Sequence, residues 1–187
     1  AQKVTASLPH ELSRFDLTAD GDDEQIRAAI RTSLNLLEVG EAGVMVPLLG
    51  AAYRSVLGPV DMAVHLVGES GTFKSTLAGL VMTHFGPTFD RTNLPASWSS
   101  TVNALEALSW HAKDVLLAID DYVPTEDNAP AKAARLFRAQ GNGNGRSRLA
   151  GSHAVQATRY PRGLILSTGE AVPERRSVRA RLVIAGV

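Results

Sequence analysis

The chain has 187 residues, of which 44% are hydrophobic and 20% charged, and its formal net charge at pH 7 is zero. A chain of this size and composition fits one globular domain. The absence of cysteine excludes disulfides and thiolate metal sites. No apolar run approaches the about 20 residues of a membrane span, so we expect a cytoplasmic protein without a membrane segment.

Charge is divided unevenly along the chain. Residues 1–131 carry 8 Lys/Arg and 17 Asp/Glu, whereas residues 132–187 carry 11 Lys/Arg and two acidic residues, Glu170 and Glu174. A basic C-terminal part indicates an anionic partner. Arginines on solvated loops would give the same count, and charge alone leaves both interpretations open.

Two helices are predicted before the first strand. Apolar residues recur at helical spacing over residues 22–37, and acidic residues occupy the first turn. A second helix is expected over residues 44–57, before Gly58 and Pro59. Residues 1–60 are therefore interpreted as an N-terminal helical segment packed on a core formed by residues 61–187.

Short apolar runs then alternate with helical segments. Strands are expected at residues 62–67, 94–98, 115–119, 163–167 and 181–185, and helices at 75–85, 100–111 and 129–140. This alternation predicts an α/β fold of three layers, with a five-stranded, mostly parallel sheet between helices. Ser99 or Ser100 is expected to cap the helix at 100–111. The glycine-rich stretch 141–145 is predicted to be a flexible turn outside any helix or strand.

A phosphate-binding loop is predicted between the first strand and the next helix. Residues 68–75 read Gly-Glu-Ser-Gly-Thr-Phe-Lys-Ser, close to the pattern G-x-x-x-x-G-K-[ST]. Glycines let backbone N–H groups point at phosphate oxygens, and the following helix adds a partial positive charge. Lys74 is predicted to reach the β- and γ-phosphates of ATP, and Ser75 to bind Mg²⁺. The predicted nucleotide-binding residues are Gly68, Glu69, Ser70, Gly71, Thr72, Phe73, Lys74, Ser75 and Thr76.

Phe73 departs from this pattern, because it stands where the last glycine is expected. A positive φ at this residue would cost about 1 kcal/mol. Two alternatives therefore stay open for the loop by itself. It could be a chance turn before a helix, or a degenerate loop that binds nothing.

Two carboxylates, Asp120 and Asp121, end the apolar strand at 115–119. In P-loop ATPases the first such carboxylate helps to hold Mg²⁺ and the next acidic residue activates the attacking water. We assign Asp120 to the metal and Asp121 to the general base. A solvated turn is the alternative, which the phosphate-binding loop disfavours. Asp in place of the usual Glu leaves open how efficiently ATP is hydrolysed.

Polar and basic residues near the last two strands are further candidates. Ser167 and Thr168 lie at the carboxyl end of a strand, where ligands of open α/β sheets bind. Either could contact the γ-phosphate or the attacking water, and a simple turn is equally consistent. Of the arginines before the last strand, we favour Arg179 and Arg181 as donors to a neighbouring subunit's γ-phosphate.

Together these segments resemble the AAA+-type ATPase domain of actinobacterial primase–helicase-like proteins, which phages and mobile elements encode. The likeness covers most of the chain from about residue 44 onward. In that family a bulky residue before the P-loop lysine, such as Phe73, is normal. The matching segments are residues 47–49, 53–54, 65–68, 71–75, 84–86, 94–95, 98–101, 103–106, 120–121, 138–142 and 162–170.

The resemblance implies a replicative helicase motor, with the AAA+ strand order and rings that translocate DNA. A hairpin over residues 141–161 would point into the pore, and its Arg146, Arg148 and Arg159 would contact the DNA, which we expect to be single-stranded. The helical lid of AAA+ proteins is missing after Val187, which indicates a fragment of a longer protein.

Two other functions stay open. A small-molecule kinase would share the loop but has no use for an arginine-rich hairpin. A binding module that uses nucleotide only for assembly would be consistent with Asp121 in place of Glu. ATP turnover stimulated by single-stranded DNA would separate the three.

Overall fold

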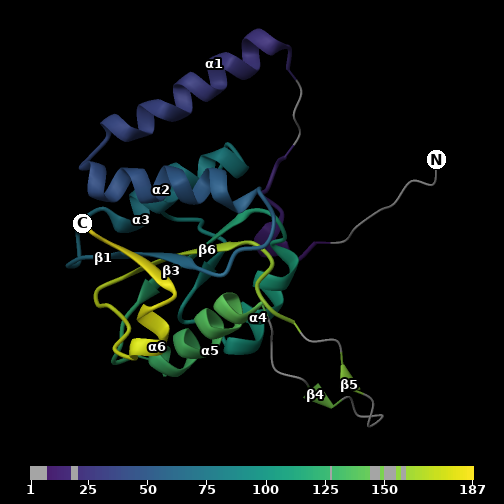
Figure 1. Cartoon of the computed structure of the whole chain (residues 1–187), viewed down its shortest axis with the longest axis vertical. Coiled ribbons are helices and arrows are strands. Elements are labelled where there is room, and N and C mark those ends of the chain that lie inside the picture. Colours follow the sequence, from purple (N-terminus) through teal and green to yellow (C-terminus); the bar gives the residue numbers. More distant parts are fainter. Residues whose placement is uncertain (1–7, 18–20, 127, 144–147, 150–154, 157–158) are drawn as a thin grey trace.

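A five-stranded parallel sheet lies between two layers of helices in the computed structural model (Figure 1). The structure describes residues 8–17, 21–126, 128–143, 148–149, 155–156 and 159–187. The strands of the sheet run in the order β2-β3-β6-β1-β7, and every neighbouring pair is parallel. The bounds are β1 (Ala63–Val67), β2 (Ala96–Ser97), β3 (Leu116–Tyr122), β6 (Leu164–Gly169) and β7 (Leu182–Gly186).

This order confirms the predicted three-layer α/β fold and the AAA+-like strand order. The three central strands β1, β3 and β6 are almost wholly buried. Because helices cover both faces, their sequences are continuous apolar runs rather than alternating patterns. The main difference from prediction is β2, which has only two residues at the sheet edge.

The helices divide between the two faces of the sheet (Figure 1). On one side lie α1 (Asp23–Leu34), α2 (Ala42–Ser55) and α3 (Lys74–Met82), and on the other α4 (Val102–His111), α5 (Ala129–Asn142) and α6 (Arg176–Arg179). Short 3-10 turns occur at η1 (His10–Leu12), η2 (Asn35–Glu38) and η3 (Thr83–Phe85). None of the helices in the described part of the chain is long and apolar enough to cross a membrane.

The two N-terminal helices differ in how they meet the core. Helix α2 buries Val44, Met45, Leu48 and Leu49 against the sheet layer, whereas α1 has no buried residue. Helix α1 is instead stabilised locally, because the Asp22 carboxylate accepts bonds from the backbone N–H groups of Glu24 and Gln25. Of the predicted N-terminal segment, α2 thus contributes most of the packing.

A separate two-stranded hairpin lies between α5 and β6. Strand β4 (Arg148–Leu149) pairs antiparallel with β5 (Val155–Gln156), outside the main sheet. The pairing lies within the region 141–161, for which the resemblance implies a hairpin, although α5 occupies the first two residues of that region. Arg159 is exposed at its base, and Arg146 lies outside the described residues.

The predicted turn at 141–145 is wrong at its first two residues. Helix α5 continues through Gly141 to Asn142 and ends at Gly143, which has a φ of 57°. A left-handed glycine is a common helix terminator, so only the third residue of the stretch breaks the helix. Gly141 stays helical and makes room for Arg181, whose Cδ would lie 2.3 Å from a Cβ there.

The predicted cap of α4 is also wrong. Thr101 caps the helix, since its Oγ1 accepts a bond of 3.3 Å from the backbone N–H of Ala104. The hydroxyl of Ser99 lies 2.9 Å from that of Ser97 instead. Three adjacent hydroxyl residues could each cap a helix in principle, and only the backbone path selects among them.

Thr101→Ala should therefore lower the free energy of unfolding by about 1 kcal/mol, because one N–H group of the first turn loses its partner. Ser100→Ala is the matched control and should leave stability nearly unchanged. Urea unfolding of the three proteins measures both values. Equal losses in the two variants would contradict the assignment of the cap to Thr101.

Candidate functional site

The loop that follows β1 turns sharply into α3. Gly71 has a φ of 87° and Phe73 a φ of 64°, so both adopt the left-handed conformation. The Phe73 ring is 73% exposed and displaces no core residue, which leaves only the backbone cost of about 1 kcal/mol. Gly68 has a different role, because a Cβ there would lie 2.5 Å from the carbonyl oxygen of Val187. The end of β7 therefore packs directly on the loop.

Lys74 lies at the first position of α3 and folds back across the loop. Its Nζ donates to the carbonyl oxygens of Gly68 at 2.9 Å and Glu69 at 2.6 Å. The side chain is only 9% exposed, and within the described residues it forms no ion pair. The two carbonyl oxygens are neutral and do not balance the charge of the ammonium group, which favours an anion nearby.

Ser75 and Asp120 meet beneath the loop. The Ser75 hydroxyl donates to Asp120 Oδ1 at 2.8 Å. Their oxygens suit Mg²⁺, which takes few protein ligands and completes its shell with water and phosphate. The described residues contain no group of three or more His, Cys, Asp or Glu that would bind a metal alone. A Mg²⁺ ion at this pair would thus need the phosphates of a nucleotide.

Thr168 connects the two acidic residues. Its hydroxyl donates to Asp120 Oδ1 and accepts a bond of 3.1 Å from the backbone N–H of Asp121. These bonds fix the direction of the hydroxyl proton, which points at the carboxylate. Thr168, predicted as a phosphate or water contact, therefore orients Asp120 in this structure.

Asp121 follows with its side chain turned to solvent. It is exposed and has a φ of 67°, which gives β3 a left-handed kink one residue before its end, where its register with β6 shifts. The kink directs successive carboxylates differently, with Asp120 facing Ser75 and Asp121 lining a cavity. The two carboxylates therefore lie in different surroundings.

The cavity lies over the loop at the carboxyl ends of β1, β3 and β6. Its volume is about 310 Å³, and it brings together the loop, Asp121 and Thr168. Arg91, a wall residue, could not be found from sequence patterns, because it belongs to no motif, whereas Glu170 lies in the segment 162–170 that carries the family resemblance. The lining residues are Ser70, Gly71, Thr72, Phe73, Lys74, Ser75, Thr76, Arg91, Asp121, Thr168, Gly169 and Glu170.

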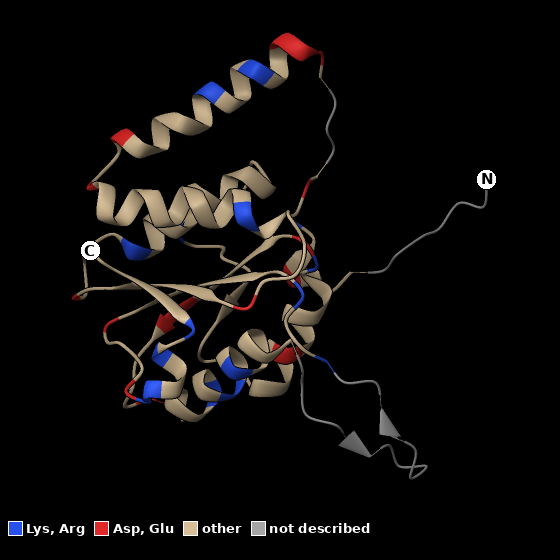
Figure 2. Cartoon of the chain, viewed as in Figure 1, with Lys and Arg blue, Asp and Glu red and all other residues tan. Residues whose placement is uncertain are grey.

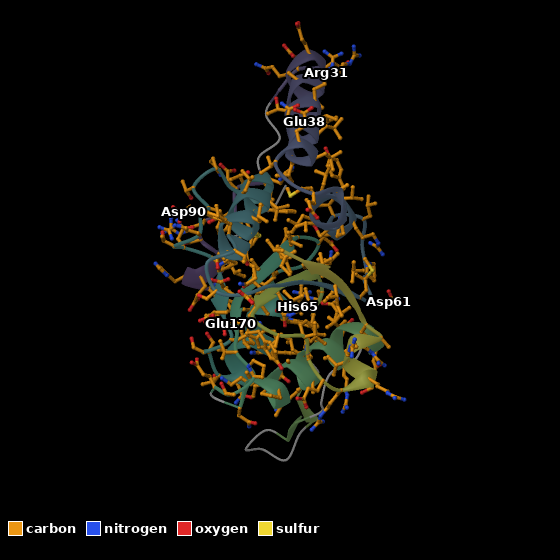
Figure 3. All side chains as sticks on the ribbon, turned by 90° about the vertical axis from the view of Figure 1, so that its left-hand side faces the viewer. Arg31, Glu38, Asp61, His65, Asp90 and Glu170 are labelled. Atoms are coloured by element: carbon orange, nitrogen blue, oxygen red, sulfur yellow. The ribbon has the colours of Figure 1, made fainter. Side chains whose placement is uncertain are left out.

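A buried polar chain supports the site from below. His65 in β1 is fully buried in the interior (Figure 3). Its Nε2 faces the carbonyl oxygen of Ala171 at 3.0 Å and therefore carries the proton. Its Nδ1 accepts from the Ser167 hydroxyl at 3.0 Å, which in turn accepts from Trp98 Nε1 at 3.0 Å. The Ser167 hydroxyl thus donates to His65 and accepts from Trp98 within the interior. Of the two neighbouring residues Ser167 and Thr168, it is Thr168 that lines the cavity.

The arginines predicted to act between subunits lie away from this cavity. Arg181 precedes β7 and donates to the Ser177 carbonyl oxygen at 2.5 Å and to Asn142 Oδ1 at 2.8 Å. Arg179 is exposed at the end of α6. Both are at the amino end of β7, opposite the edge that carries the loop. Figure 2 shows basic residues gathered on the α5 and α6 layer.

Fold and site together define the chain as an α/β domain of the P-loop NTPase class. Residues 18–159 match the family described as "Domain of unknown function (DUF927)". The chain belongs to the DUF927 family. None of the curated proteins matches it.

The solved structures that are similar to the chain include a helicase and an ATP complex. The first, described as "SCCmec type IV Cch - active helicase", has 18% identity and a TM-score of 0.53, with 94% of this chain and 33% of that chain covered. This chain thus spans about a third of the length of that protein. The second is NtrX from Brucella abortus in complex with ATP, with 17% identity, a TM-score of 0.45, and 87% and 39% covered. At these identities the likeness concerns the fold.

The buried His65 leads to a prediction on pH. Burial lowers the pKa of His65 below its usual 6.5, so the unfolded chain binds this proton more readily than the folded chain. The stability contributed by neutral His65 is present above pH 6.5 and is lost as pH falls below it. We expect His65→Gln to flatten the decline in unfolding free energy between pH 7 and pH 5.

The matched control for this prediction is His111→Gln, since His111 is exposed at the end of α4. Urea unfolding at several pH values measures the slope for each protein. A His65→Gln slope equal to the slopes of the parent and the control would refute the role of His65.

Proposed function

We propose that the chain binds Mg-ATP at the cavity over the loop and hydrolyses it. The observation that carries this proposal is the convergence of Lys74, the Ser75–Asp120 pair and Thr168 from three segments of the chain. Each group alone has a structural explanation. Together, the buried ammonium of Lys74, the oxygens of Ser75 and Asp120, and the backbone N–H groups of the loop suit a triphosphate with bound Mg²⁺.

Each residue has a distinct role in this proposal. Lys74 leaves its carbonyl partners to bind the β- and γ-phosphates, and Ser75 and Asp120 hold Mg²⁺. The metal, when bound, neutralises phosphate charge. Thr168 keeps the Asp120 carboxylate pointed at the metal position. Asp121, exposed on the cavity wall, orients the attacking water and takes its proton.

Lys74→Ala tests the binding step. The variant removes the only lysine among the described residues that line the cavity. Bonds to charged groups are worth about 1.5–3 kcal/mol, so ATP affinity should fall at least about 10-fold. Titration with a fluorescent ATP analogue measures the affinity. Lys113→Ala serves as the control, because Lys113 is exposed and pairs with Asp114. ATP affinity unchanged by Lys74→Ala would exclude the loop as a nucleotide site.

We further propose that ATP hydrolysis drives translocation along single-stranded DNA, in a ring of subunits, as part of a replicative helicase from a mobile element. The support is the family resemblance, the basic C-terminal part and the hairpin between α5 and β6. In such a ring Arg179, exposed beside β7, would reach the nucleotide of the next subunit. Arg181 is held by its own chain and is the weaker candidate.

The hairpin supplies the test of DNA binding. Replacing Arg146 and Arg148 with Ala should weaken binding of single-stranded DNA and leave ATPase activity without DNA nearly unchanged. For each DNA phosphate that the variant no longer binds, the salt slope of log K should decrease by about 0.7. The control is the double variant of Arg27 and Arg31, which are exposed on α1.

DNA affinity and its salt dependence, measured by fluorescence anisotropy, decide between the motor and its alternatives. If both quantities match the parent, the hairpin does not bind DNA. A binding module without turnover then becomes the better explanation, since Asp121 is one methylene shorter than the usual Glu.

A further inference from the structure

The cavity has a second basic wall residue besides Lys74. Arg91 lies in the loop between η3 and β2, and its side chain is exposed. It lines the same cavity as Lys74, Asp121 and Thr168. No sequence motif includes it, and the role assignments above leave it unused.

The position of Arg91 is built into the fold. Gly79 of α3 lies against this loop, and a Cβ there would approach the backbone carbon of Asp90 to 2.6 Å and the nitrogen of Arg91 to 2.8 Å. The absence of a side chain at Gly79 therefore lets the loop run along α3 toward the cavity. Any larger residue would push Arg91 outward.

Hydrogen bonds within the loop hold its shape. The Asp90 carboxylate accepts bonds from the Thr92 backbone N–H at 2.7 Å and from the Thr92 hydroxyl at 2.6 Å. The Asn93 side chain bridges the backbone of Asp90 and Thr88. The bonds from Thr92 lower the pKa of Asp90 and engage its carboxylate. Figure 3 shows Asp90 and Glu170 on the same side of the molecule.

The guanidinium of Arg91 is available for a ligand. Among the described residues it makes no hydrogen bond or ion pair. Arginine presents a planar set of donors that matches phosphate oxygens and keeps its charge at any physiological pH. An arginine whose donors are free of protein acceptors, at the wall of a phosphate cavity, is suited to an anionic ligand.

The sheet order shows which end of the nucleotide Arg91 would meet. Strand β2, which follows the Arg91 loop, pairs with β3, and β3 carries Asp120 and Asp121 at its end. The Ser75–Asp120 pair would hold Mg²⁺ in the proposed site, and the metal would neutralise charge on the terminal phosphates. Arg91 and Asp121 also line the same cavity, so Arg91 would meet a nucleotide on the side of the acidic pair, where the terminal phosphate would lie.

We propose that Arg91 binds the γ-phosphate of ATP from within the same subunit and so makes the site prefer triphosphate over diphosphate. This inference rests on the proposed nucleotide site. It differs from the role of Arg179, which could act only across a subunit boundary. Preference for ATP would then exist in a single chain before any ring forms.

The test compares the β,γ-imido analogue of ATP with ADP, both with Mg²⁺, by calorimetric titration. Arg91→Ala should lose about 10-fold in affinity for the analogue and less than about twofold for ADP. Arg91→Lys should lie between the two, because a lysine keeps the charge but not the paired donors. Arg14→Ala is the matched control, since Arg14 is exposed near Asp90 and does not line the cavity.

Two outcomes would overturn the inference while the nucleotide site stands: parent-like affinities in Arg91→Ala, or equal losses for the analogue and ADP. If the parent chain binds neither nucleotide, the proposed function itself fails. Lys74→Ala checks the nucleotide site independently of Arg91. Its affinity for both the analogue and ADP should fall, because Lys74 serves the whole site and not the γ-phosphate alone.

Discussion

The Asp120 carboxylate is the group on which the arrangement of the site depends. One of its oxygens accepts bonds from Ser75 at the start of α3 and from Thr168 at the end of β6. Three segments far apart in sequence are thereby tied together at one edge of the sheet. A carboxylate is costly to shield from water unless charged or polar partners surround it, so these bonds position the residue and also offset its desolvation. The cavity lies directly over this junction.

Close backbone packing explains how the edge is assembled. Gly68, Gly79 and Gly169 each stand where a Cβ would collide with another segment, respectively the end of β7, the Arg91 loop and Tyr122. Hydrophobic burial holds the strands in a sheet but does not distinguish positions to within an ångström. The glycines bring polar segments within hydrogen-bonding range. The loop can then act as a preformed set of donors, because its backbone is already held in shape.

Much of this could be predicted from the sequence, for a physical reason. The loop, the acidic strand end and the Thr168 strand are local patterns, in which spacing along the chain sets spacing in space. Arg91 could not be found this way, because its loop has no periodicity and its position depends on Gly79 in another element. The turn predicted at Gly141 is wrong because glycine content is a local signal, whereas this helical glycine packs against Arg181, which is 40 residues away in the sequence.

Strand β6 offers a direct physical link between the two ends of the domain. The chain passes from β5 to β6 through Arg162, which is anchored on Trp110. The Arg162 guanidinium lies 3.9 Å from the centre of the Trp110 ring, and its Nε donates to the Trp110 carbonyl oxygen at 2.5 Å. Its other end carries Thr168 beside Asp120. A fully buried central strand cannot bend or slip without breaking bonds to β1 and β3 on either side. A displacement of Thr168 caused by a change at the γ-phosphate would therefore move β6 as a unit, and its Arg162 anchor with it. In the proposed motor, this rigid connection makes β6 the element best suited to couple nucleotide state to the hairpin.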